Sequence, residues 1–207
     1  MSNQEIDVIS SDKRRAFWTV LVLNALLAAG FLFVGLVADS SSLLANGLDN
    51  TSDAAVYGLS LLALSQTRAW KRAAAKVSGT MLLIFSVLVF IDAVRRFFTG
   101  SDPIGQSMII MAIIAAAINL VSLYLLKRLE GKDVNLRAAI TFSFNDFIAN
   151  GGIIVAGVLI FMTGDNWPDL LVGAAVACIA AYGGIEILKD AHMDKHEEEG
   201  STHYPGD

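Results

Sequence analysis

Three aspartates fall inside long apolar stretches of the sequence, where an ionised side chain is costly. Asp49 and Asp53 lie near the middle of one stretch, and Asp146 lies within another. An ionised Asp at the centre of a membrane helix costs about 2.5–3.5 kcal/mol. Neither stretch carries a Lys or Arg at the same depth. The remaining ways to neutralise these acids are protonation and a bound cation. The sequence therefore predicts that they hold a cation.

The spacing of these acids places them on helix faces. Asp49 and Asp53 are four residues apart, so on a helix their side chains stand one above the other. The same faces continue with further polar residues, namely Asn46, Tyr57, Ser60, Ser143 and Asn150. Two helices that press such faces together bring three carboxylates and several neutral oxygens to one point. Such a point suits a divalent metal ion.

The elements that position the acids are expected to be membrane helices. The 207 residues are 55% apolar and only 17% charged, whereas soluble domains carry about 25% charged residues. Six apolar runs each approach the roughly 20 residues that cross a bilayer core, and lipid requires them to be helical. They are Phe17–Ala38, Ser42–Leu64, Val77–Val94, Ile104–Leu126, Leu136–Met162 and Leu170–Leu188. We therefore expect an all-α integral membrane bundle of six transmembrane helices.

The Lys and Arg residues predict the orientation of this bundle. If the N-terminus is in the cytoplasm, all fifteen Lys and Arg residues except Arg95 and Arg96 fall on cytoplasmic segments. Because Lys and Arg are enriched on the cytoplasmic side of membrane proteins, this count predicts that both termini lie in the cytoplasm. We expect a cytoplasmic segment over 1–16, a transmembrane domain over 17–188 and a short cytoplasmic polar tail over 189–207. The protein would span the cell membrane, which is the inner membrane in a Gram-negative bacterium.

The composition excludes several other classes of function. A net charge of −5 gives no basic field for a nucleic-acid partner. The single cysteine, Cys178, excludes a disulfide framework and multi-cysteine zinc sites. The histidines lie only in the last sixteen residues, where His192 and His196 stand four apart beside carboxylates. We interpret them as part of a solvated tail rather than a metal site, and we expect no cofactor.

The segment Ser40–Asp53 resembles the second-helix signature of the cation diffusion facilitator family, which is approximately S-x-S-L-L-A-x-A-x-D-S-x-x-D. The likeness continues in Asn24, Asp92 to Arg96, Asn119 and Asn145-Asp146. Family members have six transmembrane helices with both termini in the cytoplasm. The resemblance implies a secondary active transporter, not an enzyme. It would export zinc, or a related ion such as manganese, iron, cobalt or cadmium, in exchange for protons.

The resemblance also implies a site with two ligands from the second helix and two from the fifth. Asp49 and Asp53 match the first pair, and Asp146 matches one member of the second pair. The other member is normally His or Asp, but this chain has Phe142 there. The fourth ligand stays open among water, Ser143, Asn150 and Asn46. An all-oxygen site favours manganese, cobalt, iron and magnesium more than a site with imidazole does, while the family favours zinc.

The sequence ends about eighteen residues after the sixth span, so we expect a short family member without the C-terminal cytoplasmic domain of many relatives. The resemblance implies a homodimer held by membrane helices. Gly47, Gly58, Gly151 and Gly152 near the acids either permit helices to slide or simply pack closely. Asn24 and Asn119 either support the site through hydrogen bonds or only join helices.

The remaining acids have simpler interpretations. Asp92 lies within a turn of Arg95 and Arg96, and Glu186 lies three residues before Lys189, so local ion pairs are expected. Asp39, Asp165 and Asp169 fall in turns predicted to face outward. We expect them to be solvated, with an anionic exit path as the alternative.

Two other functions fit aspartates in a membrane bundle. An intramembrane aspartic protease places two acids on facing helices, but the GxGD motif of that class is absent here. Two acids one turn apart on the same helix also suit chelation better than water activation. The other alternative is a sensor or assembly protein that has the same fold but does not transport. Phe142 in place of a ligand keeps this alternative open.

Overall fold

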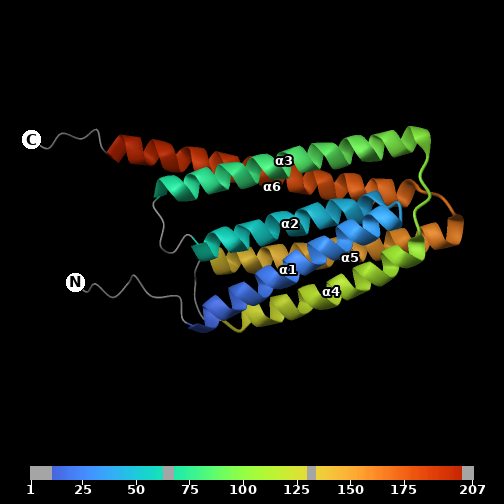
Figure 1. Cartoon of the computed structure of the whole chain (residues 1–207), viewed down its shortest axis with the longest axis horizontal. Helices are drawn as coiled ribbons and strands as arrows, with labels where there is room; N and C mark the ends of the chain where they lie inside the picture. The colour runs from blue at the N-terminus through green and yellow to red at the C-terminus, as the bar shows by residue number, and fades with distance from the viewer. Residues whose placement is uncertain (1–10, 63–67, 130–133, 202–207) are drawn as a thin grey trace, which may run out of the picture.

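A computed structural model of the protein describes residues 11–62, 68–129 and 134–201. These residues form helices and no strand, in the order α1 (Ser11–Val37), α2 (Ser41–Leu62), α3 (Arg68–Thr99), α4 (Gly105–Lys127), α5 (Val134–Thr163) and α6 (Trp167–Ser201). Figure 1 shows an elongated bundle in which the start of α1 and the end of α6 lie at the same end. The predicted all-α six-helix bundle is therefore confirmed. We call this end the inner end and the opposite one the outer end.

Within the described residues, five of the six helices are long and apolar enough to cross a membrane, and α2 is the exception. The helix α2 carries Asn46, Asp49, Asn50 and Asp53 within its 22 residues. Its position explains how it tolerates them, because it packs against α1, α3, α5 and α6. Among its described side chains only Ala55 is exposed. Polar side chains in membrane proteins face the bundle interior in this way.

The outside of the bundle is apolar. Large hydrophobic side chains such as Leu36, Phe98, Phe161 and Met162 are strongly exposed. A soluble protein rarely presents contiguous apolar surface on this scale. This surface, together with the five apolar helices, shows a multi-pass membrane protein.

Two helices extend further than the apolar runs predicted. The helix α3 begins at Arg68 rather than Val77, and α6 continues past Leu188 to Ser201. Helical hydrogen bonding does not stop where the apolar run ends, and charged residues such as Lys and Glu are good helix formers. Residues 189–201 of the predicted polar tail therefore continue α6, and 202–207 lie outside the described residues. Residues 11–16 likewise belong to α1, and 1–10 lie outside the described residues.

Glycines allow several helix pairs to pack closely. A Cβ atom on Gly105 of α4 would lie only 2.5 Å from the carbonyl oxygen of Gly157 in α5. A Cβ atom on Gly79 of α3 would lie 3.0 Å from the carbonyl oxygen of Gly184 in α6. Close contact through small residues is a common way for helices to associate in lipid. Gly47 also packs tightly, with Leu32. Among the described residues, nothing lies within 4 Å of a Cβ on Gly151, and only Val172 approaches a Cβ on Gly152.

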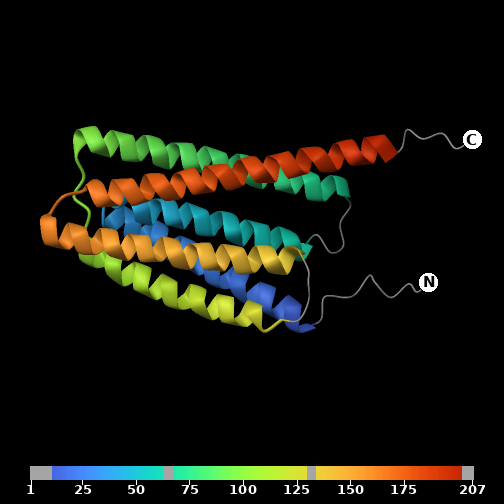
Figure 2. The same cartoon turned by 180° about the vertical axis from the view of Figure 1, so that it is seen from behind.

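The bundle consists of two groups of helices. The helices α3 and α6 pack extensively on each other, while α1 packs on α2 and α4 packs on α5. Figure 2 shows the α3–α6 pair along one side and α1, α2, α4 and α5 along the other, as does Figure 1. Contacts of α2 with both α3 and α6, and of α5 with α6, join the groups. The polar helix α2 therefore lies at the boundary between them.

Asp169 connects the groups at the outer end. This residue in the first turn of α6 is fully buried. It accepts hydrogen bonds from the hydroxyls of Ser40 and Ser42, both at 2.6 Å, and from the backbone N–H groups of Ser41 at 2.6 Å and Ser42 at 3.0 Å. The first N–H groups of a helix have no intrahelical partner, and a carboxylate stabilises them. The expectation that Asp169 is solvated was therefore wrong, because it caps α2.

Arg96 joins α3 to the turn between α1 and α2. Its Nε donates to Asp92 at 2.5 Å, and its Nη1 pairs with the Asp39 carboxylate and donates to the Asp39 carbonyl at 2.8 Å. Arg95 also pairs with Asp92, at 2.7 Å. The ion pairs predicted for Asp92 are confirmed. The Asp39 side chain is 48% exposed, in line with the expected solvated turn, and it also pairs with Arg96. Asp165 is exposed as expected.

We expect Asp169→Ala to lower the free energy of unfolding by about 2–3 kcal/mol, because it leaves buried donors of α2 without their charged acceptor. Thermal unfolding of the detergent-purified protein measures this change. The matched control Asp165→Ala removes an exposed acid of the same turn region and should change stability by less than about 0.5 kcal/mol. Equal unfolding temperatures for Asp169→Ala and the parent protein would contradict the capping role.

Candidate metal site

A cavity of about 440 Å³ lies at the boundary between the two groups of helices. Asp49 and Asp53 of α2 and Asp146 of α5 all line it, and residues of α3 and α6 close its other side. The structure thus places the three predicted site residues on one cavity wall. That they bind metal stays a prediction.

The three aspartates differ in how far they are buried. Asp146 is 2% exposed and Asp53 is 8% exposed, whereas Asp49 is partly buried. They share one cavity, and like charges in a poorly solvated space repel one another. The Oδ2 atom of Asp146 has no hydrogen-bond partner within the described residues, and no Lys or Arg is among the described residues that line the cavity. A buried carboxylate without a partner is costly, so this cavity wall favours a cation.

Hydrogen bonds between α2 and α5 determine the relative height of the acids. Asn46 Nδ2 donates to Asn150 Oδ1 at 3.0 Å, and the Tyr57 hydroxyl donates to the Ala139 carbonyl at 3.3 Å. Asp146 precedes Asn150 by one helical turn on a helix that runs opposite to α2. It therefore lies level with the α2 segment between the two aspartates, and the two hydrogen bonds flank the acids along the bundle.

The possible additional ligands lie away from the cavity. Asn46, Asn150 and Ser143 are buried, but none is among the residues that line it. Asn46 and Asn150 bond to each other, which supports a role in joining α2 to α5. Asn46 Oδ1 has no hydrogen-bond partner among the described residues. The side chain of Phe142 is outside the described part of the structure, and the identity of a fourth ligand stays a prediction.

The acids are not yet arranged as a closed coordination sphere. In the described part of the chain, no three His, Cys, Asp or Glu side chains are gathered closely enough to hold a metal ion together. A bound divalent ion would have to draw the side chains inward.

Sequence reasoning missed Glu186, which also lines the cavity. It was expected to pair with Lys189, but no ion pair joins these two described residues. The signal in the sequence was the four-residue spacing of Tyr182 and Glu186, which places them one turn apart on the same helix face. In the structure, both side chains line the cavity. Asn24, in contrast, donates to the Val20 carbonyl of its own helix at 2.9 Å, and neither it nor the buried Asn119 lines the cavity.

Comparison with known proteins identifies the family. The profile of the cation efflux transmembrane domain matches residues 17–193. The chain belongs to the cation efflux family. Its members are transporters rather than enzymes, and the resemblance drawn from Ser40–Asp53 is confirmed.

The names of individual relatives of this protein include several different metals. It is 30% identical over 188 residues to the manganese efflux system protein MneP of Bacillus subtilis (strain 168) and 28% identical over 182 residues to the zinc transporter ZitB of Escherichia coli (strain K12). It is 24% identical over 192 residues to the cadmium, cobalt and zinc/H(+)-K(+) antiporter of Bacillus velezensis. These alignments cover 82%, 80% and 83% of this chain, and 62%, 58% and 61% of the relatives. The chain thus spans about three fifths of their length.

We expect Asp53→Asn to raise the thermal stability of the metal-free protein by about 1 kcal/mol, because an amide of the same shape replaces a buried carboxylate that other acids repel. Thermal unfolding in a metal chelator at about pH 8 measures this. The same substitution should weaken metal binding. A loss of stability in the chelator would show that the carboxylate has a structural partner, and would contradict this account.

Asn46→Ala provides the opposite pattern as a control. It removes the hydrogen bond to Asn150 and should lower stability by about 1 kcal/mol. Because Asn46 does not line the cavity but helps to position α2 against α5, metal affinity should fall far less than when Asp49, Asp53 or Asp146 is replaced.

Proposed function

We propose that this protein carries a divalent metal cation out of the cytoplasm, with Asp49, Asp53 and Asp146 as the ligands. The observation that carries the proposal is the cavity wall, where three aspartates from two packed helices face one space and no basic side chain is among the described lining residues. Family membership supports transport as the activity. The relatives that are named for manganese, zinc, cadmium and cobalt support a divalent ion as the cargo.

Zinc is the proposed cargo, with manganese as the main rival. The described cavity lining offers carboxylate, hydroxyl and amide oxygens but no imidazole or thiolate. Such oxygens suit manganese and magnesium well, whereas zinc sites commonly include nitrogen or sulfur ligands. The names of relatives support zinc, since both ZitB and the antiporter carry it in their names. Titration with both ions distinguishes the two.

Proton exchange follows from the chemistry of the same side chains. Repulsion and the loss of water both disfavour three ionised carboxylates in one cavity. Protons neutralise them when no metal is bound, and a divalent ion competes with those protons for the same oxygens. Metal binding on one side and proton binding on the other would then couple the two fluxes. One relative is named as an antiporter that uses H(+).

The division into two helix groups suggests how access could alternate. The cavity lies between α2 and α5 on one side and α3 and α6 on the other. At the outer end, the Asp169 cap and the Arg96–Asp39 ion pair join the groups. Toward the inner end the cavity lining extends to Glu186 and Ile187. These features support an inward-open state, and rocking of α3 and α6 against the other helices would reverse access.

We also infer a homodimer through the membrane helices, on the basis of the family resemblance. The exposed apolar faces are compatible with close helix packing between two copies. The molecular mass of the protein in detergent, corrected for bound detergent, measures the oligomeric state.

The two rival functions predict different results with metal. A ligand stabilises the folded state by about 2.7 kcal/mol at one hundred times its Kd, so a carrier should unfold at a higher temperature when zinc or manganese is present. An aspartic protease needs no metal and should show no such shift. A sensor or assembly protein would bind metal but would not move it into reconstituted vesicles.

Asp49→Ala is expected to weaken zinc binding at least 100-fold, because it removes a charged ligand from a site that has few others. Isothermal titration of zinc and manganese into the purified parent and variant measures the affinities. The control Asp165→Asn removes one negative charge at the outer end and should bind metal like the parent. If Asp49→Ala also binds like the parent, the proposed site is wrong.

Metal binding is expected to release protons and to weaken as the pH falls. Each proton displaced per metal lowers the apparent affinity by up to about tenfold per pH unit, over the range in which the carboxylates take up protons. Titrations in two buffers of different ionisation enthalpy count the protons released, and titrations between about pH 6 and 8 give the slope. An affinity independent of pH, with no proton release, would contradict proton exchange.

A further inference from the structure

Glu186 is the fourth acidic side chain among the described residues that line the cavity, and it comes from α6 rather than from α2 or α5. Its side chain is exposed, unlike Asp53 and Asp146. Tyr182, one turn earlier on α6, lines the same cavity. Glu186, three residues before Lys189 near the inner end of α6, is therefore accessible from outside the bundle and also lines the space that the buried aspartates face.

The depth of Glu186 follows from the Asp169 cap, which places Ser41 of α2 level with Asp169 of α6. Both helices run from the outer end to the inner end (Figure 1). Asp53 lies twelve residues beyond Ser41, or about 18 Å along α2, and Glu186 lies seventeen residues beyond Asp169, or about 25 Å along α6. Glu186 is therefore about one and a half turns closer to the inner end than Asp53.

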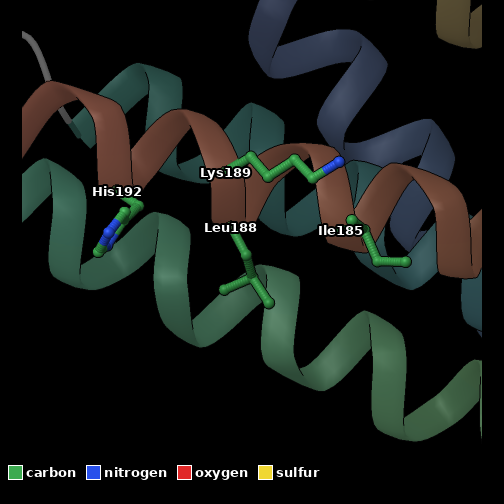
Figure 3. Close-up of a pocket in the computed structure, with 4 residues that line it drawn as sticks. All are labelled: Ile185, Leu188, Lys189 and His192. Atoms are coloured by element: carbon green, nitrogen blue, oxygen red, sulfur yellow. The ribbon is translucent and has the colours of Figure 1, made fainter.

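The basic groups near Glu186 in the sequence line a different hollow. The residues that line this second hollow, drawn in Figure 3, are Ile185, Leu188, Lys189 and His192. In that view the Leu188 side chain points toward α3, and the Lys189 side chain extends along α6. A Cβ atom on Gly79 of α3 would lie 3.0 Å from Leu188 Cγ, so α3 and α6 are in close contact at Leu188. Lys189 and His192 are not among the residues that line the cavity of the aspartates.

We propose that Glu186 is an entry carboxylate, which attracts the divalent ion from the cytoplasm and passes it to the three aspartates. This inference rests on the proposed function. A negative charge at the mouth of a cavity with low-dielectric walls raises the local concentration of cations and the rate of their entry. The deeper end of the same cavity holds Asp146, which is 2% exposed and has no hydrogen-bond partner for Oδ2 within the described chain. An ion that enters past Glu186 thus has a stronger site ahead of it.

The test compares Glu186→Gln with the parent protein in reconstituted vesicles, with zinc as the cation. The initial rate of zinc transport from the cytoplasmic face is measured against zinc concentration, at low and at high ionic strength. We expect Glu186→Gln to raise KM about fivefold and to leave kcat within about twofold, because the charge acts on capture. The difference should shrink at high salt, which screens an exposed charge.

Three controls make the result specific. Glu186→Asp keeps the charge and should restore most of the parent KM. Asp102→Asn removes an exposed acid at the outer end and should leave KM unchanged. Asp146→Asn should abolish both transport and zinc binding measured by titration.

Each other outcome overturns a definite claim. An unchanged KM in Glu186→Gln, while Asp146→Asn is inactive, would overturn the entry role and leave the proposed function standing. A fall of kcat in Glu186→Gln to the level of Asp146→Asn would also overturn the entry role, because it would show that Glu186 is itself a ligand of the transported ion. A parent protein that neither binds nor transports zinc or manganese would overturn the proposed function and this inference with it.

Discussion

The cost of a negative charge that is shielded from water governs this structure. Asp53 and Asp146 are almost fully buried and share a cavity with Asp49, yet no Lys or Arg is among the described residues that line it. In most proteins a buried carboxylate is compensated by hydrogen bonds or by a base, and the outer end of this bundle follows that rule. There Asp169 receives four hydrogen bonds and Asp39 pairs with Arg96. The contrast supports the proposal that the cavity acids bind a mobile cation.

The same constraint explains the arrangement of the helices. A helix as polar as α2 cannot face lipid, so four neighbouring helices cover it. The Asn46–Asn150 hydrogen bond sets its height against α5, and the Asp169 cap sets its height against α6. Because α2 contacts both helix groups, the proposed ligands lie where the groups meet. Movement between the groups would therefore act directly on the site.

Much of this could be predicted from the sequence, because membrane spans and buried acids have strong local signals. Apolar runs of about 20 residues set the number and order of helices, and the four-residue spacing placed Asp49 and Asp53 on one face. The sequence could not show where charged helices end beyond the membrane, so α6 proved longer than its apolar run. Contacts between distant segments were also hidden. Asp169 lies 129 residues from Ser40, and Glu186 was expected to pair with its sequence neighbour Lys189 although it faces the cavity.

The most direct test of the central claim is the position of the metal itself. Anomalous scattering from crystals of the protein grown with zinc or manganese locates the ion independently of any ligand assignment. The account predicts a peak between α2 and α5, within about 2.0–2.3 Å of carboxylate oxygens of Asp49, Asp53 and Asp146. A protein that binds metal in solution but shows its peak elsewhere, with these three side chains unligated, would contradict it.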